Sequence, residues 1–195
     1  SIDVSRYNDG ERGGVVKVVL PEQRPRLTNE EVMARCPWAT FGKLKHRGPN
    51  IVTSLELDPA EMEKRNIHLQ QKYAEIEEKE VRYEEIHCDD AEYLIVAFGS
   101  CARIAQKAME EARAEGIKVG LLRPITLWPF PSKAIAERSR QVKGILTVEL
   151  NAGQMVEDVR LAVECKVPVE YFGRLGGIVP DPDEVVTALK EKIIK

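Results

Sequence analysis

The stretch that decides the fold is residues 91–131, which read AEYLIVAFGSCARIAQKAMEEARAEGIKVGLLRPITLWPFP. It begins with an apolar run, Tyr93–Phe98, that ends at Gly99. Apolar residues then recur at helical spacing over 100–115, and a second apolar run follows over 118–122. Two short apolar runs flanking a helical segment predict a strand–helix–strand unit, and a crossover of this length favours a parallel pair of strands.

The same alternation continues to the C-terminus. The pattern predicts further strands over 144–149 and 167–172, and helices over 132–140, 153–165 and 183–194. Strands that alternate with helices indicate a parallel-rich sheet covered by helices on both faces. We therefore expect a three-layer α/β/α domain over residues 89–195.

The N-terminal part has a different pattern. Residues 1–57 are interrupted every few positions by glycine or proline, which predicts an irregular arm with one short helix beginning at residue 28 or 29. Residues 58–86 predict a long linker helix, because Asp58 can cap it, Pro59 suits its first position and its apolar residues form a narrow stripe. The expected organisation is thus an arm, a linker helix and the α/β domain.

Composition excludes several classes of function. The 195 residues are 43% hydrophobic and 31% charged with a net charge of −3, which lacks the basic surface of a nucleic-acid-binding protein. The longest apolar runs are far shorter than the ~20 residues that cross a bilayer, and the polar N-terminus resembles no secretory signal. We expect a cytoplasmic protein without nucleic-acid or membrane partners. Because the first residue is not Met, we also expect a piece of a longer protein.

The cysteines and histidines predict no metal site. The spacing of Cys36, Cys88, Cys101 and Cys165 matches no zinc or iron–sulfur pattern, and the three histidines have no nucleophile or acid at a catalytic spacing. We expect reduced thiols, no metal ligands and no catalytic residue in this chain. Cys101 has two interpretations: a helix start can lower the pKa of a thiol and make it reactive, whereas burial makes it inert.

Polar residues follow several of the expected strands, where ligands of parallel sheets bind. Gly99 and Ser100 precede a helix, so that Ser100 can simply cap it or the free N–H groups can hold an anion. Arg123 can bind an anion or pair with an acidic residue. Asn151 and Gln154 can bind a polar group or simply form a capped turn. These five residues are the candidate anion or substrate edge, at which Glu149 is expected to be structural.

The segment Trp128-Pro129-Phe130-Pro131 combines two aromatic rings with two rigid prolines. Large aromatic rings in such a frame suit a packed contact. They can cover the sheet of their own domain or meet another domain or subunit. We expect an interface at Trp128 and Phe130, for which a homodimer is one candidate.

Several of these segments resemble the thiamine-diphosphate-dependent 2-oxoacid:ferredoxin oxidoreductases. The resemblance is to the second half of their alpha subunit, a part similar to a transketolase C-terminal domain. The residues that carry it are Phe98-Gly99-Ser100 with Ala102-Arg103, Arg123 to Pro131, Glu149 to Met155, Gly173-Arg174 and Gly176-Gly177. Upstream, Asn50-Ile51-Val52, Ser54-Leu55 and Leu57-Asp58-Pro59 resemble the branched-chain, 2-oxoisovalerate-type members.

The resemblance implies an enzyme that oxidatively decarboxylates a 2-oxoacid, forms an acyl-CoA and reduces ferredoxin. Its parent complex would hold thiamine diphosphate, magnesium and iron–sulfur clusters, with beta, gamma and delta subunits as partners. The family's Gly-Asp-Gly motif is matched here only by Asn8-Asp9-Gly10, so this chain alone is expected to bind none of these cofactors and to serve as a scaffold and assembly domain.

Alternatives remain at this point. The substrate can be 2-oxoisovalerate, 2-oxoglutarate or pyruvate. The domain can belong to another thiamine enzyme, such as a transketolase or the beta subunit of a 2-oxoacid dehydrogenase. It can also be an interaction module without a catalytic role.

Overall fold

A computed structural model describes residues 16–19, 26–36 and 54–194 of the chain. The chain divides into two compact units, one of residues 1–21 with 76–195 and one of residues 22–75. Most of the arm predicted over 1–57 lies outside the described residues, including Asn8-Asp9-Gly10 and Asn50-Ile51-Val52.

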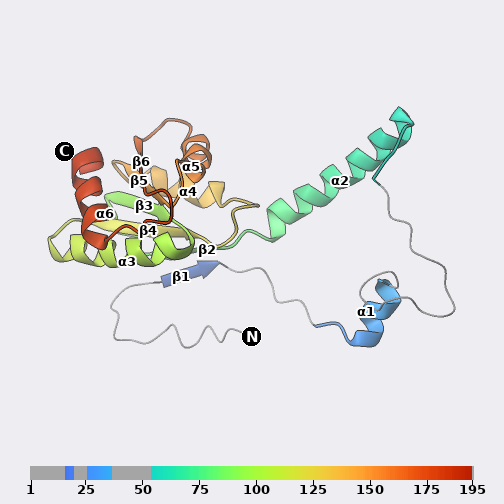
Figure 1. The fold of residues 1–195 in the computed structure, drawn as a ribbon, viewed down its shortest axis with the longest axis horizontal. Helices are drawn as coiled ribbons and strands as arrows, with labels where there is room; N and C mark the ends of the chain where they lie inside the picture. Colours follow the sequence, from blue (N-terminus) through green and yellow to red (C-terminus); the bar gives the residue numbers. More distant parts are fainter. Residues whose placement is uncertain (1–15, 20–25, 37–53, 195) are drawn as a thin grey trace. The chain divides into compact units, whose positions relative to one another are not determined.

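The larger unit is built on a mixed sheet with the strand order β1-β2-β4-β3-β5-β6 (Figure 1). The strands are β1 (Val16–Val19), β2 (Tyr83–Ile86), β3 (Tyr93–Ala97), β4 (Val119–Pro124), β5 (Ile145–Glu149) and β6 (Val169–Gly173). Strands β4, β3, β5 and β6 are parallel, whereas β1 and β2 extend the sheet antiparallel. The helices are α3 (Gly99–Ala114), α4 (Ser132–Ser139), α5 (Met155–Val163) and α6 (Pro182–Leu189), which continues as a π-helical turn over Lys190–Ile194.

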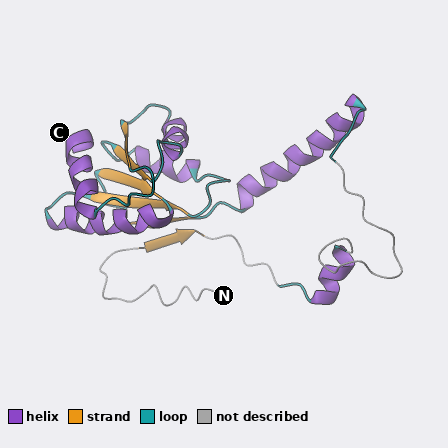
Figure 2. Ribbon diagram, in the orientation of Figure 1, coloured by secondary structure: helices purple, strands orange, loops and turns teal. Residues whose placement is uncertain are grey.

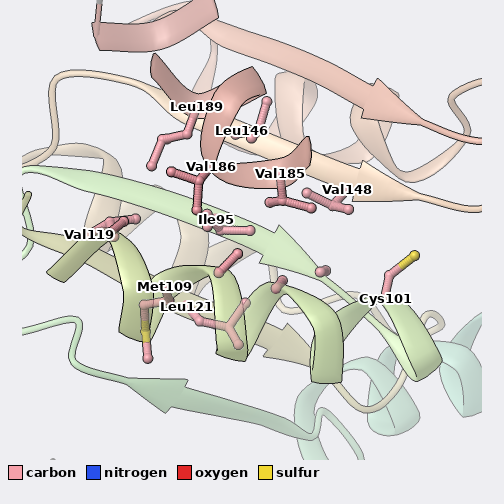
Figure 3. Packing of buried hydrophobic residues seen from close by; sticks show 14 of the residues in the cluster. Ile95, Cys101, Met109, Val119, Leu121, Leu146, Val148, Val185, Val186 and Leu189 are labelled. Atoms are coloured by element: carbon pink, nitrogen blue, oxygen red, sulfur yellow. The ribbon is translucent and has the colours of Figure 1, made fainter. Parts of the chain in front are cut away.

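Two hydrophobic cores hold three layers together (Figure 2). Because side chains alternate along a strand, Ile95 and Ala97 of β3 enter the core beneath α3 and α6. Leu94 and Val96 of the same strand enter the core beneath α4 and α5. Figure 3 shows the first core, in which Met109 of α3 and the buried residues of α6 meet the central strands. The prediction of a parallel-rich α/β/α domain is confirmed.

Strand β2 corrects the predicted linker helix. The helix over 58–86 ends at Lys79, and Tyr83–Ile86 instead pairs antiparallel with β4. Within β2, Glu85 is only 4% exposed, and both its carboxylate oxygens accept hydrogen bonds from the guanidinium of Arg138 at 2.9 and 2.8 Å. The buried residues of β2 are the adjacent Glu85 and Ile86, so the strand shows no alternation of apolar and polar residues, which explains why the sequence pattern extended the helix through it.

The smaller unit contains α1 (Asn29–Arg35), and α2 (Pro59–Lys79) runs from it into the larger unit. Thr28 caps α1 through a capping box with Glu31. The start of α2 agrees with the sequence, since Oδ1 of Asp58 accepts hydrogen bonds from the N–H groups of Ala60 and Glu61 at 2.8 and 3.2 Å. The helices among the described residues are all too short or too polar to span a membrane.

Candidate functional site

The sheet brings the predicted site residues to one edge. The parallel register pairs Val96 with Leu122, Ala97 with Val148, and Glu149 with Gly173. The segments that follow β3, β4, β5 and β6 therefore leave the sheet on the same side, which we call the carboxyl edge.

The start of α3 differs from the prediction that Ser100 caps it. Gly99 is already the first helical residue, Phe98 occupies the N-cap position, and no side chain caps the helix. Gly99 has a left-handed φ of +57°, which glycine adopts without strain, and an added Cβ would meet no atom within 4 Å. Ser100 is exposed. The first turn of α3 thus leaves its backbone N–H groups without a side-chain cap at the carboxyl edge.

The side chain of Glu149 caps the start of α5. This side chain is fully buried at the end of β5. Its Oε2 accepts hydrogen bonds from the N–H groups of Gln154 at 3.2 Å and Met155 at 2.8 Å, and its Oε1 accepts one from Val156 at 3.0 Å. A carboxylate is well suited to this position, because free N–H groups and the helix dipole both favour negative charge. The prediction that Glu149 is structural agrees with this geometry.

The polar groups of the turn between Glu149 and α5 form hydrogen bonds within the domain. Nδ2 of Asn151 donates to Oε2 of Glu149 at 3.1 Å, and Oδ1 of Asn151 accepts from the N–H of Gly153 at 2.7 Å. The hydroxyl of Tyr171 donates to the carbonyl of Asn151. Burial, followed by the charge of Glu149, raises the pKa of Tyr171. Asn151 therefore has a structural role, as one of its alternatives predicted, whereas the side chain of Gln154 is exposed.

The arginines of the carboxyl edge are paired within the domain. Nη1 of Arg123 donates to Glu84, its cross-strand neighbour on β2, at 3.0 Å. Nη2 of Arg174 donates to Glu184 of α6 at 2.6 Å. The structure shows Arg123 paired with an acidic residue, one of its two alternatives, and anion binding there stays a prediction.

The loop after β4 is anchored but keeps an exposed ring. Oγ1 of Thr126 accepts from the N–H of Arg82 at 3.0 Å and donates to the carbonyl of Pro129 at 2.8 Å. The peptide bond between Trp128 and Pro129 is cis. Phe130 packs against the core beneath α4 and α5, whereas Trp128 is 54% exposed. The two rings predicted together at an interface thus differ in burial: Phe130 packs against the core of its own domain, whereas the ring of Trp128 is mostly exposed.

Trp128 is accompanied by other exposed apolar side chains on the loops of this edge. Together they are Ile125, Leu127, Trp128, Leu150, Leu175, Ile178 and Val179, and we call them the apolar edge residues. Of these residues, only Trp128 was expected from the sequence to lie at an interface. The other residues could have been found as large aliphatic residues that directly follow a strand or lie in a glycine-rich loop. At such positions a side chain does not reach either hydrophobic core.

The cysteine of this edge is buried. Cys101 is buried in the first turn of α3, and burial, followed by the charge of Glu149, raises its pKa. Both observations agree with the inert thiol, the second of its two interpretations. Among the described residues, no three histidine, cysteine or acidic side chains gather as metal ligands. These residues do not fit a magnesium or iron–sulfur site, and we derive no chemical step through such groups.

Comparison with known proteins identifies the domain. Residues 91–185 match the family model of the pyruvate:ferredoxin oxidoreductase core domain II. The ketoisovalerate oxidoreductase subunit VorB of Methanothermobacter thermautotrophicus is 49% identical over 79% of this chain and 43% of its own length. The 2-oxoglutarate synthase subunit KorA of Methanothermobacter marburgensis is 33% identical over 52% of this chain and 27% of its own length.

A solved structure shares the fold. It is the 2-oxoglutarate:ferredoxin oxidoreductase of Magnetococcus marinus with 2-oxoglutarate, coenzyme A and succinyl-CoA bound, and it matches with a TM-score of 0.53 and 25% identity. The match covers 70% of this chain and 24% of that chain.

The fold and the matched segment define a core domain of the pyruvate:ferredoxin oxidoreductase type. The chain belongs to the family of 2-oxoacid:ferredoxin oxidoreductase subunits, as its resemblance predicted. It spans less than half the length of the curated relatives it matches.

Proposed function

We propose that the chain is the scaffold and assembly part of a thiamine-diphosphate-dependent 2-oxoisovalerate:ferredoxin oxidoreductase. In this proposal it belongs to the alpha subunit of that enzyme. The observation that carries this proposal is the composition of the carboxyl edge. Arg123 and Arg174 of this edge are paired with glutamates, while the apolar edge residues remain exposed. Such a surface offers little for acid–base chemistry and much for packing against a protein partner.

The choice of substrate rests on the relatives. The chain is 49% identical to a ketoisovalerate oxidoreductase subunit and 33% identical to a 2-oxoglutarate synthase subunit. We therefore propose a branched-chain 2-oxoacid as the substrate, which the complex oxidises and decarboxylates to an acyl-CoA while reducing ferredoxin. Cytoplasmic location belongs to the same proposal.

The cofactors belong to the rest of the complex in this proposal. Thiamine diphosphate, magnesium and the iron–sulfur clusters would be held by the beta, gamma and delta subunits or by other parts of this subunit. In the described residues, the uncapped start of α3 at Gly99 and Ser100 is the place where an anionic group of substrate or coenzyme A would meet this domain. Arg123 and Asn151 then position the loops around it, and the exposed side chain of Gln154 lies at the same edge.

Substrate assays on the complete complex test the proposal. The complex is purified with all its subunits and supplied with coenzyme A and an electron acceptor. The value of kcat/KM is then compared for 2-oxoisovalerate, 2-oxoglutarate and pyruvate. We expect 2-oxoisovalerate to be preferred, and a preference for either of the other acids would contradict the substrate assignment. Calorimetry of the chain alone with thiamine diphosphate and magnesium is expected to show no tight binding.

A further inference from the structure

In the part of the chain that the structure describes, β6 is the last strand at one side of the sheet (Figure 1). The carbonyl of Pro168 accepts a hydrogen bond from the N–H of Ile145 on β5 at 2.9 Å. Because backbone groups alternate in direction along a strand, Val169 and Tyr171 direct their N–H and C=O groups away from β5. A row of such groups is a template on which another strand can add.

Two cations from the neighbouring helices occupy the outward carbonyl groups. Nη2 of Arg160, on α5, donates to the carbonyl of Val169 at 3.3 Å. Nζ of Lys192, in the π-helical turn after α6, donates to the carbonyl of Tyr171 at 2.9 Å. The acceptors that another strand would use are therefore bound within the chain, and charged side chains at an edge oppose strand addition.

The π-helical turn decides where Lys192 lies. The buried residues of α6 are Val185, Val186, Ala188 and Leu189. In a continuous α-helix, Lys192 would follow Val185 by seven residues and would lie on this buried face. A π turn closes its hydrogen bonds over five residues where an α-helix closes them over four, which moves the buried face on by one residue. That face therefore continues with Ile193 and Ile194, and Lys192 is exposed.

Contacts on both sides of Lys192 hold the turn in place. Cγ2 of Ile193 lies 2.6 Å from the position that a Cβ of Gly144 would take, so that only glycine fits beneath it. Nζ of Lys190 donates to the carboxylate of Glu115, which follows α3. Lys192 is thus held beside β6 by the packing of its own segment.

The edge that these cations cover is complementary to itself. In an antiparallel pair of two β6 strands centred on Tyr171, the outward residues Val169 and Gly173 lie opposite each other. The same register places Glu170 opposite Phe172, so that no like charges meet across the pair. Without its cations, the edge is therefore suited to a second copy of this chain.

We propose that Arg160 and Lys192 form an autoinhibitory contact, which prevents two copies of this chain from joining their sheets through β6. The strand lies along the side of the sheet, whereas the apolar edge residues follow the ends of strands. The inference therefore does not depend on the assignment of the oxidoreductase. It implies that partners of the domain attach elsewhere than along β6.

Removal of both cations from the full chain tests the contact. Methionine keeps an unbranched stem but has neither the charge nor the donors, so the variant is Arg160→Met combined with Lys192→Met. Sedimentation equilibrium compares its dimer dissociation constant with that of the unchanged chain. We expect the constant to fall at least about tenfold, which corresponds to about 1.4 kcal/mol.

Two control variants separate this effect from a change of charge or of surface polarity. Lys133→Met combined with Arg140→Met removes two exposed cations from α4 and its end, and it should leave the dissociation constant unchanged. Arg160→Lys combined with Lys192→Arg keeps both cations and should behave as the unchanged chain does. Thermal unfolding confirms that all the variants fold.

Amide hydrogen exchange measured by NMR locates the new contact. The outward N–H groups of Val169 and Tyr171 should exchange fast in the unchanged chain and become protected in the Arg160→Met, Lys192→Met chain as its concentration rises. An unchanged dissociation constant of that variant, equal association of the α4 control, or association without protection of these two amides would each overturn the proposal. Protection of both amides in the unchanged chain would overturn it as well.

Discussion

At the scale of single residues, Glu149 explains more of the carboxyl edge than any other side chain. Its carboxylate satisfies three backbone N–H groups at the start of α5 and one side-chain amide. A group from solution that approached the start of α5 would have to displace it. The turn over 151–154 is therefore a structural support for the edge.

Replacing Glu149 with Gln tests this role. Glutamine keeps the shape but has a single acceptor oxygen in place of two charged ones, so buried N–H groups lose their partners. We expect the variant to lose about 2–3 kcal/mol of unfolding free energy in urea. Glu157→Gln, an exposed position in the first turn of α5, is the control and should change stability by less than about 0.5 kcal/mol. Equal stability of the two variants would contradict the structural role of Glu149.

The cysteines provide a second test at this scale. Burial raises the pKa of Cys88 to about 12 and also raises that of Cys101, whereas Cys165 is exposed. Only the thiolate is alkylated, so at about pH 8 Cys165 should be labelled by iodoacetamide while Cys88 and Cys101 stay protected. Because the folded pKa of Cys88 lies above the unfolded value of 9.0, its contribution to stability is complete below about pH 9 and declines as the pH rises toward 12.

Mass spectrometry of the labelled peptides measures the rates. Labelling in urea, where all thiols are accessible, is the control. Alkylation of Cys101 as fast as that of Cys165 in the native chain would indicate an activated thiol at the start of α3 and contradict the burial account.

At the scale of elements, the sequence predicted the strands and helices whose apolar residues recur at a regular spacing. Strands β3 to β6 and helices α3 to α6 appear within a few residues of their predicted bounds, because each has an apolar face that its own spacing reveals. Strand β2 was missed because one of its two buried residues is Glu85, whose partner Arg138 lies 53 residues away. The cap at Ser100 was misplaced because the helix begins one residue earlier, at Gly99. A side chain such as Glu149 reveals its partners only after folding.

Strand β2 makes a testable contribution to the domain. A variant that begins at residue 89, the boundary expected from sequence, lacks β2 and leaves Arg138 without its buried carboxylate partner. A variant that begins at residue 76 retains it. Breaking a buried ion pair by removing one partner costs about 3–5 kcal/mol, so the shorter variant should be less stable by at least that amount. Urea unfolding of both variants provides the comparison, and equal midpoints would show that β2 is dispensable.

At the scale of the whole molecule, we propose that the apolar edge residues face other parts of the oxidoreductase. The fold alone could not have revealed this role. It follows from which side chains the domain leaves unburied.

Assembly of the Trp128→Ala variant tests the central claim most directly. The subunit is co-expressed with the other subunits of the complex, and the amount that co-purifies is measured together with the melting temperature of the chain alone. Leu161→Ala, an exposed apolar position on α5 away from the carboxyl edge, is the control. We predict that Trp128→Ala reduces co-purification at least about tenfold, as loss of an interface hot spot does, while the melting temperature changes by less than about 2 °C. Intact assembly of Trp128→Ala combined with a large loss of thermal stability would contradict the account and assign the tryptophan to the core of its own domain.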